Sequence, residues 1–247
     1  MNRTIRRRRM AAMALMAIGM TACSGEPDGG SPAAPASPST EKRARVLSQQ
    51  QLENAIVDAH DLPGVRVNEI GVGTDGLGNG VIHAARPADT APSLCAPVSA
   101  AADGASGYTP VASVLRVAGT KGNSALLTLV SYRSADAAKV MEELRTSLKS
   151  CKGYEVGTGA MKVTYEDVEA TDAPPQGDEG VAFRLKWVLE PGKDGLRSPF
   201  IVAVIRHGST LAVYRADSHT PEGSANISRD LVNAQSRLLE AAVHAPS

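Results

Sequence analysis

The stretch Val181-Ala-Phe-Arg-Leu-Lys-Trp-Val-Leu-Glu190 decides the predicted fold. Every odd-numbered residue from Val181 to Leu189 is apolar, whereas Arg184, Lys186 and Glu190 fall on the opposite face. This period of two is typical of a β-strand with one buried face. Trp187 belongs to the alternation, so we expect it in the core; a place in a ligand pocket is the alternative interpretation.

The neighbouring segments extend this strand into a sheet. Residues 200–205 are apolar on both faces, which indicates a covered central strand, and residues 211–215 form the next strand after a tight turn. The three strands predict an antiparallel meander. Upstream, residues 161–165 alternate like a half-buried strand, and residues 111–118 and 125–132 predict a β-hairpin around a Gly-rich turn.

Three segments have helical periodicity. Residues 41–59 contain Ser48 and Gln51 at the spacing of a capping box, Ser134 precedes the apolar stripe of a second helix, and residues 225–243 form a third. Strands at 65–72 and 81–85 are predicted to flank a Gly-rich turn, residues 73–80, in which a phosphate-binding loop is the weaker alternative. The predicted strands and helices do not alternate as in βαβ units, so the predicted class is α+β. We expect a mainly antiparallel sheet packed with three helices in a single domain, 45–247.

Residues 1–22 have the organisation of an export signal. A basic segment with Arg at 3 and 6–9 precedes an apolar run, 10–20, that is too short to span a hydrocarbon core of roughly 30 Å. The run ends in Met20-Thr21-Ala22-Cys23, which resembles a bacterial lipobox. That resemblance implies cleavage before Cys23 and its lipidation with diacylglycerol and a further acyl chain such as palmitate. An ordinary secretory peptide cut near Ala22 is the alternative, and both general and twin-arginine export remain open.

The chain after the leader is acidic and poor in aromatic residues. Without the five leader arginines, 21 basic residues face 26 acidic ones, a net charge of −5. This charge argues against nucleic acid as a partner, and 3% aromatic residues disfavour stacking platforms for sugars or bases. Residues 23–44 are rich in Gly, Pro, Ala and Ser, so they predict a flexible linker between the lipidated cysteine and the domain.

Two cysteines remain besides Cys23. An even pair in an exported chain predicts a disulfide between Cys95 and Cys151, which would pin a helix end to the segment 86–109, interpreted as a polar loop or a short helix. A reactive thiol is the alternative, but no His lies near either cysteine in the sequence.

No pattern in the chain identifies a catalytic or metal site. None of the five histidines, at 60, 83, 207, 219 and 244, has metal-ligand spacing, and no Gly-x-Ser-x-Gly elbow is present. The carboxylates of 166–167, 178–179 and 194 are interpreted as solvated loop charges rather than an acid–base pair. We therefore predict no enzyme activity, no cofactor and no metal, and the ligand-binding residues are not identified.

The order of these features resembles a known family. A helix is followed by Leu62-Pro63-Gly64, a Cys-bearing loop, a hairpin ending in Val130-Ser131-Tyr132, a helix from Ser134, and Cys151. From residue 46 to residue 243 this looks like the extracellular sensor domain of PknH-type receptor Ser/Thr kinases, which also occurs in actinobacterial lipoproteins. The resemblance implies ligand sensing or envelope interaction without catalysis.

Two functions from different classes follow as expectations. The first is a lipoprotein anchored through Cys23 at the extracytoplasmic face of the cell membrane, with a non-catalytic sensor-like domain that binds a small ligand. The second is an envelope interaction protein that docks a membrane or cell-wall partner without a small ligand. A cleft beside the sheet would favour the first, and an exposed apolar patch would favour the second.

Overall fold

The computed structural model describes seven stretches of the domain, which are residues 45–69, 89–120, 123–133, 135–158, 161–192, 195–218 and 224–245. The predicted leader, Cys23 and the linker lie outside these residues. So do the predicted strand 81–85, the Gly-rich turn before it, and Ser134.

The described strands form one antiparallel sheet in the order β1-β3-β4-β9-β8-β7-β6-β5-β2. The strand bounds are β1 Arg66–Glu69, β2 Thr90–Ala91, β3 Ala112–Thr120, β4 Asn123–Ser131, β5 Gly153–Thr158, β6 Met161–Thr171, β7 Glu179–Val188, β8 Arg197–His207 and β9 Thr210–Ser218. The predicted hairpin is β3–β4, and the predicted meander is β7–β8–β9. The α+β class is therefore confirmed, whereas β2 and β5 were not predicted.

Four α-helices lie in the described residues, where the sequence predicted three. They are α1 Gln49–Ala55, α2 Ala96–Ala102, α3 Asp136–Leu148 and α4 Arg229–His244. The additional helix is α2, seven residues with Pro in its first turn, which is too short to show helical periodicity. The capping box of Ser48 and Gln51 is present, but α1 ends at Ala55 rather than near residue 59, because Ile56 is extended.

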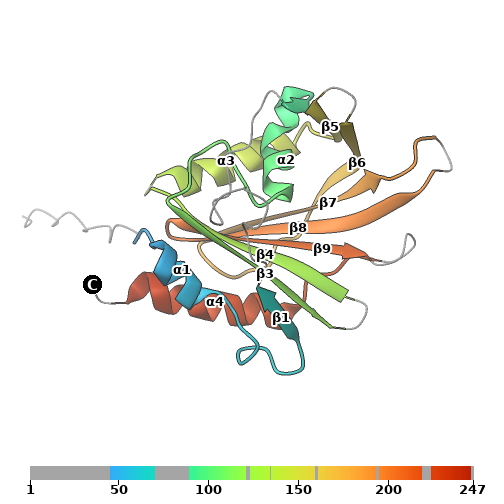
Figure 1. Ribbon diagram of the computed structural model, residues 1–247. Coiled ribbons are helices and arrows are strands. Elements are labelled where there is room, and N and C mark those ends of the chain that lie inside the picture. Colours follow the sequence, from blue (N-terminus) through green and yellow to red (C-terminus); the bar gives the residue numbers. More distant parts are fainter. Residues whose placement is uncertain are drawn as a thin grey trace, which may run out of the picture. The chain divides into compact units, whose positions relative to one another are not determined.

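The helices cover both faces of the sheet. Helices α2 and α3 pack on one face and α1 and α4 on the other (Figure 1). Side chains of β7 point alternately to the two faces of the sheet. Phe183 and Leu185 belong to the hydrophobic core under α2 and α3, and Ala182 belongs to the core under α1 and α4. Trp187 was predicted in the core but is 37% exposed, because strands β7 and β8 extend beyond the helices (Figure 1).

Helix α4 is held in place by a buried glutamine. The side-chain amide of Gln235 donates a hydrogen bond to the Ala55 carbonyl oxygen (2.6 Å) and accepts one from the Val57 backbone N–H (3.0 Å). Both backbone groups lie just where α1 ends, so they would otherwise be buried without partners. This bridge fixes the position of α4 relative to α1 and hence to the sheet.

Candidate functional site

A cleft lies between the N-terminal half of α4 and the β6–β8 part of the sheet. Its volume is about 550 Å³, within the range of small-molecule sites. We call it the α4 cleft and define it by its floor on β7 and β8, the loop 172–176 after β6, and the α4 residues Arg229, Val232 and Asn233.

The sheet register builds the sheet side of the α4 cleft, in which Ala182, Ala203 and Ile201 form the floor and Thr171 and Arg184 lie beside it. Thr171, Ala182 and Ala203 are directly opposite one another on β6, β7 and β8, and Arg184 is opposite Ile201 in the next row. Residues opposite in a ladder share one face, as do residues two apart on a strand. All five side chains therefore lie on the α4 face. The two alanines are small, so they leave space beneath the helix.

The loop 172–176, which forms one wall of the cleft, approaches the sheet closely because a glycine follows it. Gly177 has φ +73°, and a Cβ at this position would lie 2.5 Å from the Arg206 carbonyl oxygen. The loop is also tied to α4, since the Gln176 amide donates a hydrogen bond to Asn233 Oδ1 (2.7 Å). The wall of the cleft is thus positioned from both sides.

Replacing Gly177 with alanine should loosen this wall. Gly64 is a matched control, because its φ is +79° but no atom lies within 4 Å of a Cβ there. We expect Gly64→Ala to cost about 1–2 kcal/mol of unfolding free energy from left-handed strain. Gly177→Ala should cost about 1–3 kcal/mol more, because the methyl group also displaces backbone. Chemical denaturation of both variants measures the difference, and equal losses would contradict the close approach.

The rim of the cleft carries two exposed arginines. Arg184 projects from β7 and Arg229 from the first turn of α4, and within the described residues neither forms an ion pair. By contrast, Arg197 pairs with Glu166 at 2.6 Å, and Arg206 pairs with Asp178 at 3.0 Å. Asp172 is the acidic residue of the lining. The arrangement offers hydrogen-bond donors and positive charge above an apolar floor.

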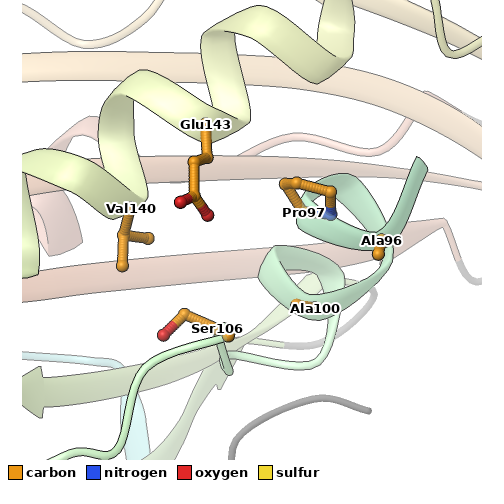
Figure 2. A pocket seen from close by; sticks show the side chains of 7 residues that line it. Ala96, Pro97, Ala100, Ser106, Val140 and Glu143 are labelled. Carbon is orange, nitrogen blue, oxygen red and sulfur yellow. The ribbon is translucent and has the colours of Figure 1, made fainter. Parts of the chain in front are cut away.

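The other helix face has hollows of a different kind. A pocket of about 70 Å³ lies between α2 and α3, where Val140 and Glu143 point from α3 toward Ser106 and Pro97 (Figure 2). A wider hollow of about 700 Å³ over α3 is more open, and most of the residues that line it are exposed. The α4 cleft is therefore the better candidate for a ligand site.

Glu143 is engaged by a tyrosine beside these hollows. The Tyr108 hydroxyl donates a 2.6 Å hydrogen bond to Glu143 Oε1, and this bond raises the pKa of Tyr108 to about 12. A tyrosine held protonated in this way is a hydrogen-bond donor and no base at neutral pH.

An aromatic group with an arginine lies on the sheet face opposite the α4 cleft. The rings of Tyr154 and Tyr165 stack with centroids 4.8 Å apart, and Tyr165 meets the edge of Phe200 at 5.7 Å. The Arg215 guanidinium lies 4.6 Å from the Phe200 centroid and 3.8 Å from the Asp103 carboxylate. These aromatic rings contact one another and Arg215.

The carboxylates noted in the sequence form ion pairs instead of an acid–base pair. Lys186 pairs with Asp167 at 2.7 Å, and Arg145 and Arg206 both bind Glu179. Burial would raise the pKa of Glu179, but the hydrogen bonds from the two arginines outweigh it and lower that pKa. Asp194 lies outside the described residues.

Of the histidines, His60 and His244 are exposed, whereas His83 and His219 lie outside the described residues. His207 was interpreted as a surface residue, but it is 3% exposed at the end of β8. Burial lowers its pKa, and its Nε2 has no hydrogen-bond partner in the described part of the chain. No group of His, Cys, Asp and Glu side chains suited to a metal ion occurs in that part either.

The stability of the domain should fall in mild acid because of His207. Its folded pKa lies below the ordinary 6.5, so the unfolded chain binds the proton more readily. Stability is lost as the pH falls through 6.5 toward the folded pKa, by about 1.4 kcal/mol for each unit of depression. The facing charges are Glu240 on α4, Asp178 and Arg206. Denaturation at pH 7.5 and 5.0 should show this loss in the parent and in His60→Gln, and a smaller loss in His207→Gln. An unchanged loss in His207→Gln would contradict this assignment.

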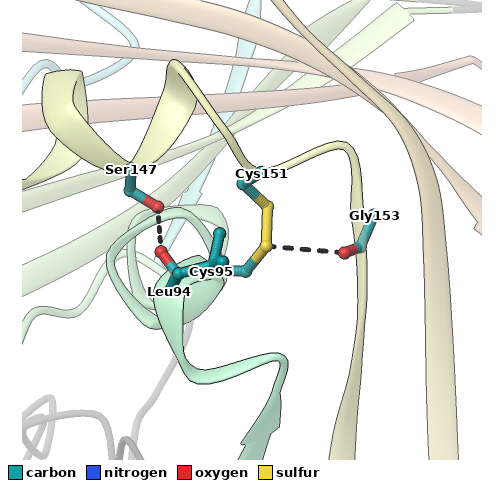
Figure 3. Close-up of a disulfide and its surroundings, with 5 residues drawn as sticks. All are labelled: Leu94, Cys95, Ser147, Cys151 and Gly153. Carbon is teal, nitrogen blue, oxygen red and sulfur yellow. Dashed lines mark hydrogen bonds between the residues drawn. A yellow bond between two sulfur atoms is a disulfide. The ribbon is translucent and has the colours of Figure 1, made fainter.

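Cys95 and Cys151 form a disulfide with a Cα–Cα distance of 5.2 Å (Figure 3). Cys151 lies just beyond α3, as predicted, and its backbone N–H donates to the Ser147 carbonyl oxygen (2.8 Å). Cys95 was predicted in a loop without regular structure. It instead ends the 3₁₀ helix Ser93–Cys95 and leads directly into α2, whose Val98 is fully buried. Ser147 Oγ also donates to the Leu94 carbonyl oxygen (2.6 Å), so the junction is held by more than the sulfurs.

No protein-family model and no curated protein sequence matches the chain. Among solved structures, it is similar to the extracellular domain of PknH from Mycobacterium tuberculosis. The identity is 11%, the match covers 81% of this chain and 98% of that one, and the TM-score is 0.49. A putative uncharacterized protein (Rv0999 ortholog) from Mycobacterium smegmatis matches with 17% identity, coverages of 82% and 96%, and a TM-score of 0.36.

The family named from the sequence is thus found again among structural neighbours. At these identities and TM-scores, the likeness carries no function from either protein to this chain. In the described residues, no helix has the length and apolarity needed to cross a membrane.

Proposed function

We propose that this chain is a lipid-anchored extracytoplasmic protein whose domain, 45–247, binds a small ligand in the α4 cleft without catalysing a reaction. The observation that carries the proposal is the cleft itself. Its floor on β7 and β8 is apolar, its volume is about 550 Å³, and exposed arginines lie at its rim. A non-catalytic role is supported by Glu166, Asp167 and Glu179, which are engaged by basic side chains.

Membrane anchoring and export rest on the sequence before the domain. The lipobox-like Met20-Thr21-Ala22-Cys23 supports lipidation of Cys23. A disulfide between Cys95 and Cys151 is consistent with an oxidising compartment.

Native mass spectrometry of the chain purified from its own membranes tests ligand binding. We expect a bound small molecule on the parent protein. Ile201 is a half-buried residue of the floor, so Ile201→Trp should fill the cleft and remove that molecule. Val111→Trp at a 49% exposed position is the matched control and should retain it. A parent without any bound small molecule would contradict the proposal.

A second function is favoured by a different observation. Trp187, Leu189 and Leu196 are 37%, 42% and 38% exposed near the end of the β7–β8 hairpin. The two leucines are joined by a 2.9 Å hydrogen bond from the Leu189 N–H to the Leu196 carbonyl oxygen. An exposed group of this kind suits docking to an envelope partner. In the same spectra, a stoichiometric protein partner lost in Trp187→Ser, with no small molecule present, would favour this function instead.

A further inference from the structure

We propose that the ligand of the α4 cleft is an anionic amphiphile, a single acyl chain with a phosphate or carboxylate head group. This inference rests on the proposed ligand-binding function and assigns the chemical class of the ligand. It follows from three properties of the cleft: an apolar floor, arginines that have no acidic partner among the described residues, and a limited volume.

The floor suits hydrocarbon. Ala182, Ala203 and Ile201 on the sheet and Val232 on α4 present no hydrogen-bonding side-chain atoms to the cleft. A polar ligand placed on this floor would lose its hydrogen bonds to water without replacement. An acyl chain would instead gain by leaving water.

The rim suits an anion. Arg184 and Arg229 come from different elements, β7 and α4, and both line the cleft. Within the described residues neither has an acidic partner within ion-pair distance, although Glu169 is directly opposite Arg184 in the ladder. A guanidinium binds phosphate or carboxylate oxygens through paired N–H groups. The lining contains two arginines against the single acid Asp172, so its local charge is positive although the mature chain is acidic.

The volume limits the number of chains. A methylene group occupies roughly the volume of a water molecule, about 30 Å³. A cleft of about 550 Å³ therefore holds one chain of a dozen or more carbons with a head group, but not two such chains.

Dodecyl phosphate below its micelle-forming concentration is a suitable probe. The chain from Cys23 to Ser247 is prepared with Cys23→Ser, so that no acyl group of its own competes. Calorimetry and native mass spectrometry should show one equivalent bound to the parent. Dodecyl maltoside and dodecyltrimethylammonium should bind at least tenfold more weakly, and inorganic phosphate alone should neither bind nor compete.

Charge reversal tests the rim. Arg184→Glu and Arg229→Glu should each weaken dodecyl phosphate binding about five- to tenfold, which corresponds to the loss of one exposed charge interaction and its replacement by repulsion. Arg237→Glu is the matched control: it is also exposed on α4 but does not line the cleft, and the net charge changes equally. Its binding should equal the parent's. Because all three arginines are exposed, thermal unfolding should show each variant folded.

The outcomes separate this inference from the proposed function. Equal binding of all three dodecyl compounds, unaffected by the rim variants, would overturn the anionic head group and leave ligand binding intact. If inorganic phosphate alone competed with dodecyl phosphate, the requirement for an acyl chain would be contradicted. Failure of every amphiphile to bind, with another small molecule found on the native protein, would overturn only this inference; absence of both would overturn the proposed function as well.

Discussion

Cys95→Ser, Cys151→Ser and the double variant should all lower the free energy of unfolding by similar amounts, about 2–5 kcal/mol. Breaking one bond from either end removes the same constraint, so equality among the three variants is the informative result. The cross-link spans 56 residues, for which loop-closure entropy gives about 4 kcal/mol. Both cysteines are fully buried, so a serine hydroxyl adds a smaller local cost at either position.

The structure also explains why the domain should survive this loss. Helix α2 has apolar contacts of its own through Val98, Ala101 and Ala102, and Ser147 remains bonded to the Leu94 carbonyl oxygen. We therefore expect folded variants with a lower midpoint rather than unfolded chains.

Urea denaturation with and without reductant measures the effect. Reductant should lower the stability of the parent to that of the double variant and leave the double variant unchanged. Thiol counting on the denatured, unreduced mature domain, 45–247, should find no free thiol. Two free thiols, or a double variant as stable as the parent, would show that the cysteines are unpaired.

The long strands could be predicted because each has enough residues to show its own hydrophobic pattern. The alternation of Val181 to Leu189 and the apolar run of 200–205 each give the strand type without information from elsewhere. Strand β5 has six residues with Gly at 153 and 157, and β2 has two, so neither shows a period. Helix α2 follows the 3₁₀ helix Ser93–Cys95 and has only seven residues, and its burial depends on α3 and the sheet.

The α4 cleft was not predictable, because its residues come from segments far apart in the chain. Arg184 was assigned to the face of its strand opposite the apolar residues, which is correct, but part of that face is covered by α4. The sequence does not give the strand register that places Ile201 opposite Arg184. Nor does it give the position at which α4 begins over these two residues. Trp187 was misassigned for the same reason: the alternation gives its face, but the extent of the helix layer decides its exposure.

The other large effect is expected at Cys23. Cys23→Ala should release the protein from the membrane or leave it as an uncleaved precursor that retains residues 1–22. Two acyl chains on one cysteine give stable anchoring, since each buried methylene contributes about 0.8 kcal/mol, whereas a single chain gives only marginal binding. A chain without the thiol cannot accept the thioether-linked diacylglycerol.

Fractionation of cells that express each variant measures this effect, with intact mass spectrometry to establish processing and lipidation. Cys95→Ser is the matched control, because it also replaces one cysteine but leaves the lipobox-like sequence unchanged. It should be found in the membrane fraction with the mass of a processed, acylated chain. Nearly all Cys23→Ala protein should lack the acyl mass and either appear in the soluble fraction or run as the larger precursor. A Cys23→Ala protein that is cleaved normally and still sediments with membranes would show that the anchor lies elsewhere in the chain, and the lipoprotein assignment would then be wrong.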